Sequence, residues 1–382
     1  MRTVTLVVVN AEGELLGQVP PFDVPTPWWQ DVEPVVAVHP DLVVLRLLHV
    51  APSPTGPMGG QVTYLAECAS PPAGLDAFAG RTAWLEDHPL RLPWARPGGP
   101  ASDIAWAETH VELTGPPRQI RTWNLSAIWR LPTADGERWL KCVPPFFAHE
   151  ATVIAQLGPS PSLPSVVAAE GHRILLLALP GVDGYGATPT QFEEIIDALV
   201  GLQLGAPAGL RDLVPDWTGG SLRAGVEDVL RGRGRERPGL RHLLDGWDRR
   251  FDGIAECGLP DTVFHGDAHP GNARIDVSPP IILDWGDIGW GHPLLDLAVL
   301  DGLPIERAPA TVLDHWLGCW ADALPGSRPH QAWNLLEPVA AARGAVVFHR
   351  FLEAIEPSER IYHRDDVEPC LARAEKLASR VA

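Results

Sequence analysis

The sequence predicts an α+β chain in three successive parts: a small β-rich domain, a small α/β lobe and a larger, mainly helical lobe. Valine- and leucine-rich runs fill much of the first 70 residues, and a proline- and glycine-rich stretch follows at 92–100. From residue 188 onward, apolar residues recur mostly at helical spacing. A length of 382 residues fits two or three domains. We expect a β-rich accessory domain over 1–95, a linker and helix over 96–115, the small lobe over 116–180 and the helical lobe over 181–382.

Composition and charge exclude several classes of function. The chain carries 30 basic and 48 acidic residues, for a formal charge of −18, whereas a general nucleic-acid binder needs a basic face. A negative chain permits cationic substrates. No apolar run reaches the length of about 18 residues that crosses a bilayer. The five cysteines are scattered without a CxxC pair, as in free thiols of a reducing compartment. We therefore expect a cytoplasmic protein with neither nucleic acid nor membrane as a partner.

The N-terminal part has the pattern of a small sheet. Its strand-like runs cover 4–9, 35–50 (with a break at Pro40) and 61–67, bounded by proline and glycine. Its acidic residues are scattered and do not form the glycine, arginine and glutamate pattern of Nudix hydrolases. A degenerate Nudix-like sheet and a separate hydrolase therefore remain open interpretations of this part.

The middle of the chain alternates strand-like and helix-like segments. Ser102 is the expected N-cap of a helix that runs to about Leu113. Two strand-like runs, 123–131 and 138–143, flank Asp135-Gly136, which predicts a hairpin. A helix over about 149–157, a buried strand over 173–179 and a helix from about Thr190 to Leu204 follow. Near the C-terminus, long helical patterns carry tryptophans expected in the core: Trp316, Trp320 and Trp333.

The most informative segment reads His265-x-Asp267, with Asn272 five residues later and Asp284 after an apolar run. The spacing His-x-Asp-x-x-x-x-Asn matches the catalytic loop of phosphoryl-transfer enzymes. A strand over 274–277, a turn and a returning strand over 281–283 would carry Asp284 back beside Asn272. Two oxygen ligands at one point suit Mg²⁺, and a nearby carboxylate can take the proton of an acceptor hydroxyl. The pattern therefore favours phosphoryl transfer at this loop.

Four further polar residues are candidates for supporting roles. We expect His265 to brace the loop through hydrogen bonds. His269 either reaches the transferred phosphate or is an ordinary loop histidine. Asp287 is a candidate second acid on the metal side. Asp296 lies at an expected helix start, where its carboxylate could accept backbone N–H groups from the catalytic loop.

Segments 265–272 and 283–298 resemble the two signatures of the aminoglycoside phosphotransferase/choline kinase family, whose fold is protein-kinase-like. The resemblance extends more loosely over about 117–365 and leaves out 1–100. It implies a two-lobed, Mg²⁺-dependent kinase that uses ATP or GTP and acts on a small-molecule hydroxyl. It also implies that Asp267 is the catalytic base and that Asn272 and Asp284 bind Mg²⁺.

The same resemblance points to nucleotide-binding residues upstream. Lys141, one of two lysines in the chain, ends a predicted strand, and we expect it to contact the α- and β-phosphates. Glu150, in the first turn of the next helix, would orient that lysine. Backbone groups near Ala178 and Leu179 would bind the base. The loop that should cover the phosphates has no glycine, which leaves Ser126 as its candidate contact.

The acceptor is the least defined part of the prediction. Glu353 and Glu356 could hold an aminated sugar or lie on a solvated helix face, and Trp290 could stack on a ring or pack in the core. His292 stands where related sequences usually carry Asp. An aminoglycoside, an amino sugar or another amino alcohol would fit. The alternative is a non-catalytic nucleotide-binding or interaction protein on a kinase-like scaffold, which the glycine-free loop favours.

Overall fold

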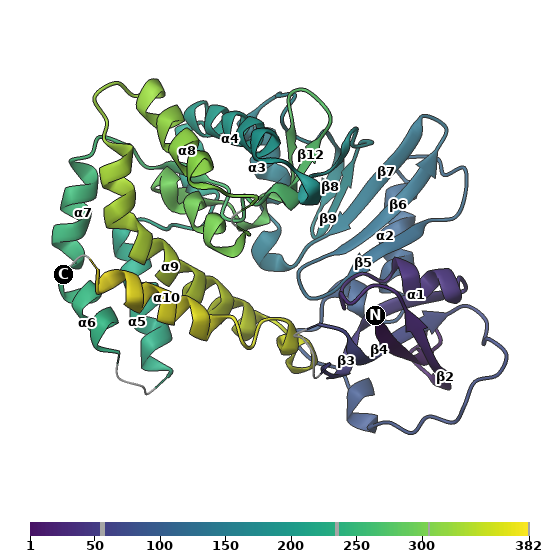
Figure 1. Cartoon of the computed structure of the whole chain (residues 1–382). Coiled ribbons are helices and arrows are strands. Elements are labelled where there is room, and N and C mark those ends of the chain that lie inside the picture. Colours follow the sequence, from purple (N-terminus) through teal and green to yellow (C-terminus); the bar gives the residue numbers. More distant parts are fainter. Residues whose placement is uncertain (54–57, 234–236, 305, 381–382) are drawn as a thin grey trace. The chain divides into compact units, whose positions relative to one another are not determined.

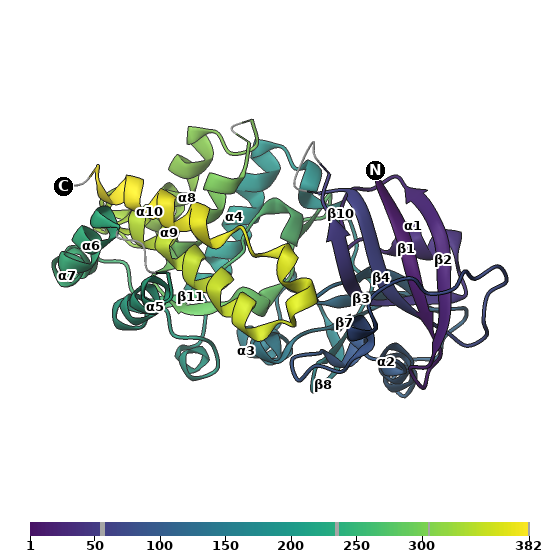
Figure 2. The same ribbon diagram turned by 90° about the horizontal axis from the view of Figure 1, so that it is seen from below.

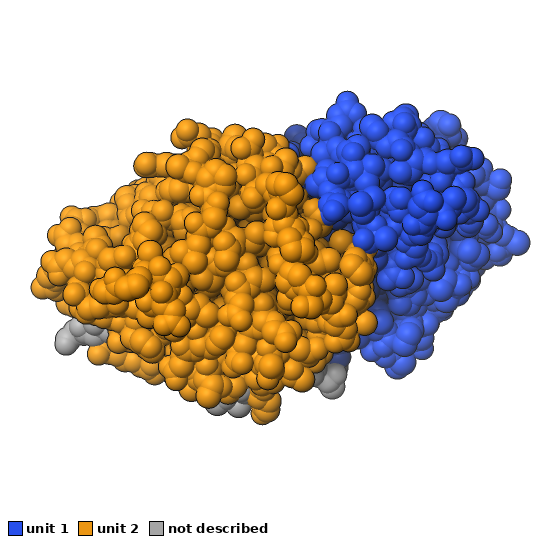
Figure 3. Space-filling view, turned by 90° about the horizontal axis from the view of Figure 1, so that it is seen from above, with its two compact units in different colours: residues 1–148, 165–178, 352–362 blue, residues 149–164, 179–351, 363–382 orange. Residues whose placement is uncertain are grey.

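The computed structural model describes residues 1–53, 58–233, 237–304 and 306–380, and the chain forms two compact units (Figure 3). Unit 1 comprises Met1–Ala148, Ser165–Ala178 and Leu352–Tyr362. Unit 2 comprises His149–Pro164, Leu179–Phe351 and His363–Ala382. The mixture of sheets and helices confirms the expected α+β class (Figure 1). The boundaries expected near residues 95 and 115 lie inside unit 1, so the finer division of the chain stays a prediction.

The described residues of unit 1 form two sheets and two α-helices. The first sheet has the strand order β2-β1-β4-β3, in which only the central pair β1 and β4 is parallel (Figure 2). The second has the order β5-β6-β7-β9-β8 and is antiparallel. The elements are β1 (Arg2–Val9), β2 (Leu15–Val24), α1 (Glu33–Val38), β3 (Leu42–Ala51), β4 (Gly60–Cys68), α2 (Gly99–Glu108), β5 (Arg118–Thr122), β6 (Ala127–Thr133), β7 (Gly136–Cys142), β8 (Val166–Glu170) and β9 (Arg173–Leu176).

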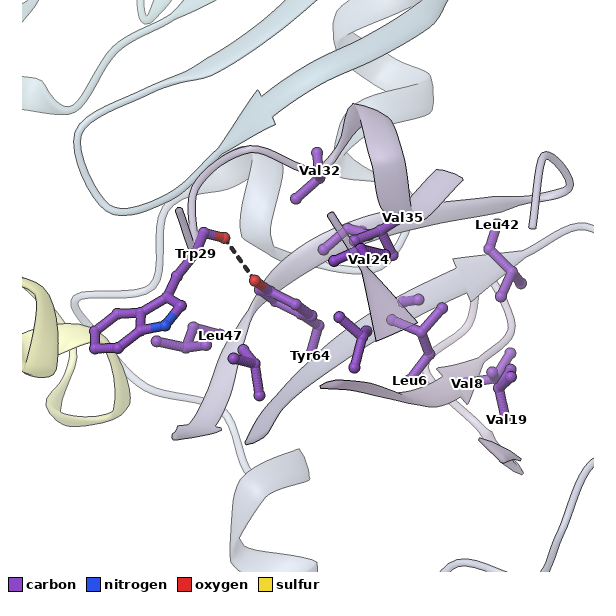
Figure 4. Close-up of a cluster of buried hydrophobic side chains, with 14 of the residues drawn as sticks. Leu6, Val8, Val19, Val24, Trp29, Val32, Val35, Leu42, Leu47 and Tyr64 are labelled. Carbon is purple, nitrogen blue, oxygen red and sulfur yellow. Dashed lines mark hydrogen bonds between the residues drawn. The ribbon is translucent and has the colours of Figure 1, made fainter. Parts of the chain in front are cut away.

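The continuous valine run of β1 is explained by burial on both faces of the first sheet. Val4, Leu6 and Val8 point into one apolar cluster, in which the Tyr64 hydroxyl donates to the Trp29 carbonyl at 2.6 Å (Figure 4). Val7 and Val9 belong to a second cluster on the other side. A strand buried on both faces needs apolar residues at every position, which removes the usual alternation.

Several local predictions for unit 1 need correction. Residues 35–38 are helical in α1, because Pro34 lies in its first turn and only Val35 is buried there. Helix α2 begins at Gly99, after Gly98 with φ +74°, so Ser102 is inside the helix and not its N-cap. The strand expected over 173–179 ends at Leu176. Strands β2, β5 and β8 were not predicted from the sequence. The hairpin around Asp135-Gly136 is confirmed as β6 and β7, with Thr133 paired to Gly136.

Unit 2 is mainly helical and holds short strand pairs. Strands β10-β12-β13 form one small sheet, and β11 pairs with β14. Helix α4 begins at Pro189, one residue before the predicted start, and its N-cap Thr188 forms a capping box with Gln191. Trp316, Trp320 and Trp333 are buried, as predicted. Among the described residues, no helix is long and apolar enough to span a membrane. The elements are α3 (Glu150–Leu157), β10 (Val182–Asp183), α4 (Pro189–Leu204), α5 (Gly219–Arg231), α6 (Pro238–Asp245), α7 (Trp247–Ala255), β11 (Thr262–Phe264), β12 (Ala273–Ile275), β13 (Ile281–Ile282), β14 (Gly289–Gly291), α8 (Ala310–Ala323), α9 (Pro329–Ala354) and α10 (Val367–Ala378).

Candidate active site

The loop that carries Asp267 lies in unit 2, between strands β11 and β12. The predicted hairpin after it is present, since β12 and β13 pair antiparallel with Ala273 opposite Ile282. The ladder continues one step further, where the Leu283 N–H donates to the Asn272 carbonyl at 2.7 Å. This register brings the segment that ends in Asp284 alongside Asn272.

Asn272 fixes the position of Asp267. Its Nδ2 group donates to the Asp267 backbone carbonyl and to Asp267 Oδ2, both at 2.9 Å. The Asp267 side chain is still 46% exposed. Because the Asn272 amide nitrogen faces Asp267, its amide oxygen is directed away and is available to another partner. The result is an oriented carboxylate that remains open to solvent.

Asp296 anchors the start of this loop from the protein interior. Its carboxylate accepts the His265 N–H at 2.8 Å, the Gly266 N–H at 2.6 Å and the Gln203 amide at 2.9 Å. Burial raises the pKa of Asp296, while His265, the backbone N–H groups of His265 and Gly266, and the nearby Arg343 act against the rise. His265 is also buried, and its Nε2 donates to the Leu283 carbonyl at 2.8 Å. Asp296 and His265 therefore tie the loop to the segment before Asp284.

Gly266 and Arg343 complete this support and were missed by sequence reasoning. Gly266 has φ +89°, and a Cβ there would overlap the Asp287 carbonyl. Arg343 of α9 is buried beneath the loop, donates to the Gly266 carbonyl at 3.3 Å, and lies 4.6 Å from the Phe264 ring centroid. It lies 77 residues away in the chain, so no local pattern could have identified it.

Asp284 has an unusual backbone conformation. Its φ of 63° and ψ of 61° fall in the left-handed region, which non-glycine residues enter at a cost of about 1–3 kcal/mol. Such strain persists where the surroundings impose it and is frequent at functional sites. A 3₁₀ turn, Trp285–Asp287, follows and contacts the start of α3. There, Glu150 is buried, and burial lowers the pKa of the adjacent His149, which hydrogen-bonds the Gly286 backbone.

His269 lies next to Asp267. Its Nδ1 accepts the Gly271 N–H at 3.0 Å, so the neutral ring carries its hydrogen on Nε2. That nitrogen is 3.6 Å from Asp267 Oδ2. The side chain is 25% exposed, which leaves it accessible beside the carboxylate.

The candidate nucleotide residues are distributed over both units. Lys141 lies buried in β7 of unit 1, opposite Ile128 and Ile174. Ser126, also in unit 1, accepts a hydrogen bond from the Trp123 indole at 3.0 Å. Ala178 is exposed two residues after the end of β9.

Leu179 is the first residue of the segment Leu179–Phe351 of unit 2. The side chain of Arg274, in β12, forms hydrogen bonds with the backbone at the start of this segment. The Arg274 guanidinium donates to the carbonyls of Leu179 at 3.5 Å and Pro180 at 3.2 Å, and to the Gly181 carbonyl. The sequence predicts Arg274 only as the first residue of the strand over 274–277.

The prediction that Glu356 binds the acceptor needs correction. Its side chain in unit 1 is 5% exposed and forms an ion pair with Arg91 at 3.0 Å and a longer one with Arg46 at 3.8 Å. A buried carboxylate that is already paired with arginine side chains is not available to bind a ligand. Glu353 is exposed near the end of α9.

Trp290 and His292 lie in and just after β14 of unit 2. Trp290 is partly buried and pairs with Val263. His292 is buried, and its Nδ1 accepts the Leu294 N–H at 3.3 Å, capping the 3₁₀ helix Pro293–Gly302. An aspartate could make the same cap, so His292 can fill the place where the resemblance leads us to expect one. Burial lowers the pKa of His292 to about 4, so the ring is neutral near pH 7.

Comparisons with known proteins identify a family and a fold. Residues 119–317, just over half of the chain, match the profile of the phosphotransferase enzyme family. No curated protein matches the sequence. Choline kinase LicA from Streptococcus pneumoniae is similar with a TM-score of 0.55 at 13% identity, over 73% of this chain and 99% of that one. A choline/ethanolamine kinase family protein from Mesorhizobium loti has a TM-score of 0.52 at 17% identity, over 72% and 94%.

A type I macrolide 2'-phosphotransferase is also similar, with a TM-score of 0.51 at 19% identity, over 72% of this chain and 95% of that one. At these identities the similarity concerns the fold, and it confirms the protein-kinase-like architecture expected after the N-terminal part. Each match leaves more than a quarter of this chain uncovered.

Proposed function

Because the chain belongs to the phosphotransferase enzyme family, we propose that it is an Mg²⁺-dependent kinase that transfers the γ-phosphate of ATP or GTP to a hydroxyl of a small molecule. The observation that carries the proposal is the half-exposed Asp267 carboxylate, held by two hydrogen bonds from Asn272, whose backbone pairs with the residue before Asp284. A non-catalytic protein has no need to keep an oriented acid open to solvent at this position.

Asp267 is the proposed base. Its carboxylate orients the acceptor hydroxyl and accepts its proton as the new oxygen–phosphorus bond forms and the bond to the leaving nucleoside diphosphate breaks. The Asn272 amide on Oδ2 restricts rotation of the carboxylate, which favours one direction of approach. His269 Nε2, on the same carboxylate oxygen at a longer distance, is a candidate donor to the transferred phosphoryl group.

Asn272 and Asp284 are the proposed Mg²⁺ ligands. An amide oxygen and a carboxylate are hard oxygen donors of the kind Mg²⁺ selects, and the β12/β13 register supports their proximity. The left-handed backbone at Asp284 supports a role that fixes this carboxylate in one direction. When bound, the ion neutralises phosphate charge. Asp287, in the turn that follows, is a candidate partner on the same side.

The residues that we propose to bind the nucleotide are those expected from the sequence. Lys141 is the candidate cation for the α- and β-phosphates, supported by its rigid place in β7, and Glu150 is the acid that accompanies it. Ser126 is the candidate phosphate-loop contact. Backbone groups of Ala178 and Leu179 are candidates for the base, since the strand ladder stops at Leu176 and leaves them unpaired by β9.

The proposed acceptor is a small hydroxylated molecule that carries an amine. A net charge of −18 and the exposed Glu353 favour a cation, and Trp290 is the candidate for stacking. Proteins of similar fold include a choline kinase and a macrolide phosphotransferase, so the fold serves acceptors of different size.

The scaffold alternative has one observation in its favour. The glycine-free turn at 123–126 is closed on itself by the Trp123 N–H to the Ser126 carbonyl at 3.0 Å and by the indole on the Ser126 hydroxyl. A turn held in this way has fewer free donors for phosphate than a glycine-rich loop.

A transfer assay with the full chain separates the two functions. We would incubate it with Mg²⁺ and either ATP or GTP against choline, ethanolamine, amino sugars, aminoglycosides and macrolides, and detect the phosphorylated product by mass spectrometry. The kinase proposal expects one product class, absent with Asp267→Asn. Nucleotide binding without transfer to any acceptor would favour the scaffold.

A further inference from the structure

Helices α4 and α8 of unit 2 lie side by side and bring three potential metal ligands together away from the Asp267 loop (Figures 1 and 2). Asp197 comes from α4, and His315 and Cys319 come from α8. The two α8 residues are four positions apart, so they share one face of the helix. We propose that Asp197, His315 and Cys319 bind a divalent transition-metal ion, with Zn²⁺ as the best fit.

The ligand atoms have almost the spacing of a tetrahedral zinc site. Cys319 Sγ is 3.6 Å from His315 Nε2 and 3.3 Å from Asp197 Oδ1, and the latter two atoms are 2.8 Å apart. With zinc bonds of about 2.0 Å to nitrogen and oxygen and about 2.3 Å to sulfur, tetrahedral ligands are separated by about 3.3–3.6 Å. The Asp197–His315 distance has to widen by about half an ångström and the Cys319–Asp197 distance by about a quarter of one. A rotation of the exposed Asp197 carboxylate suffices.

The chemistry of the ligands selects the ion. Thiolate, imidazole and carboxylate together suit Zn²⁺, whereas the amide and carboxylate oxygens near Asp267 suit Mg²⁺. Asp197 is 59% exposed and His315 32% exposed. Solvent can therefore supply the fourth ligand, as in three-ligand zinc sites.

A second cluster of the same residue types shows why this one is favoured. In unit 1, Asp103, Cys142 and His172 also lie together. There, however, the Arg173 guanidinium donates to Asp103 Oδ1 at 2.7 Å, and His172 shares that same oxygen at 2.9 Å. A fixed positive charge on the only carboxylate opposes a metal ion. The buried cluster is a structural ion-pair network and makes a matched control.

The proposed ion would join α8 to the helix that supports the catalytic loop. Gln203, near the end of α4, donates to Asp296, and its carbonyl accepts the Thr262 hydroxyl at 2.9 Å. The site does not depend on the proposed kinase activity, because its ligands are separate from Asp267, Asn272 and Asp284.

A cobalt titration of the full chain tests the site directly, because a thiolate bound to Co²⁺ gives a charge-transfer absorption that oxygen ligands do not give. We would titrate Co²⁺ in excess Mg²⁺, which fills oxygen-only sites, and then displace it with Zn²⁺. We expect one equivalent with the thiolate band, loss of that band in Cys319→Ser, and at least tenfold weaker binding in His315→Ala and Asp197→Asn.

Cys142→Ser is the control and should bind like the original chain. The serine variants change one atom, and their melting temperatures show whether they are folded. A thiolate band that persists in Cys319→Ser, that disappears in Cys142→Ser, or that is absent from the original chain would overturn the proposal.

Discussion

Two buried carboxylates, Asp296 in unit 2 and Glu359 in unit 1, are similar in environment and different in what they hold. Both are shielded from solvent, and burial raises the pKa of each, for Glu359 to about 8. Asp296 accepts two N–H groups of a loop whose next residue is the half-exposed Asp267. Glu359 accepts the Leu47 N–H at 3.4 Å and lies among groups that are buried themselves. A buried carboxyl group marks a candidate site only when it fixes a group that solvent can reach.

The Glu359 cluster explains how the N-terminal part is integrated into unit 1. Arg46 of β3 and Arg91 face Glu356, and Asn124 donates to the Glu359 carbonyl at 3.4 Å. Elsewhere in the unit, the Gln119 side chain of β5 bonds both the N–H and the carbonyl of Val44, at 2.9 and 2.7 Å. The first sheet is therefore held to the second by buried polar contacts, and its charges serve packing.

Replacement of the exposed acid should have the largest effect. Asp267→Asn keeps the shape of the side chain but removes the proton acceptor, and we expect transfer to fall by about 10³-fold or more. Binding of nucleotide with Mg²⁺ should change by less than about threefold, because Asp267 is not a proposed ligand. Steady-state transfer and calorimetric nucleotide titration measure the two effects. Near-normal turnover would refute Asp267 as the base.

Matched carboxylate-to-amide substitutions at Asp296 and Glu359 test the difference between the two buried clusters. Asp296→Asn turns one of two acceptor oxygens into an NH₂ group that faces a backbone N–H, and should cost about 2–4 kcal/mol of stability. Displacement of the loop should lower turnover about 10- to 100-fold. The matched change Glu359→Gln should leave turnover unchanged. Equal effects of the two variants on turnover would remove the distinction between the clusters.

The pH dependence of stability should differ in the Glu359→Gln variant. Between about pH 4.5 and pH 8, the folded chain keeps a proton on Glu359 that the unfolded chain releases, so stability falls as pH rises. Glutamine abolishes this term. Relative to the variant, the original chain should lose up to about 4 kcal/mol between pH 5 and pH 8. Urea unfolding at the two pH values measures the difference, and parallel curves would contradict the raised pKa.

The smallest effect is expected at the exposed acceptor candidate. Glu353→Gln should raise KM for an amine acceptor by about two- to fivefold, because an exposed charge pair contributes up to about 1 kcal/mol. Glu356→Gln, buried against Arg91, should change the melting temperature and leave KM unchanged. KM measurements with both variants test the pair, and a larger KM effect from Glu356 would reverse the assignment.

Local patterns predicted the geometry of the Asp267 loop well because its polar residues follow short strands at fixed spacing. The β12/β13 hairpin and the contact of Asp296 with the loop were both visible in this way. Partners from distant segments were not visible, since Arg343 and Gln203 reach the loop only through tertiary packing. Glu356 had the spacing of a solvated helix face, and it is buried against Arg91, which lies 265 residues away in the chain, and against the still more distant Arg46.

The most direct test of the account is a calorimetric titration of non-hydrolysable ATP and GTP analogues, each with and without Mg²⁺, into the original chain and Asp284→Ala. We predict that one analogue binds the original chain more tightly with Mg²⁺, and that Asp284→Ala loses most of this gain. Absence of binding, or a Mg²⁺ effect that is equal in both chains, would contradict the assignment of Asp284 and with it the proposed kinase site.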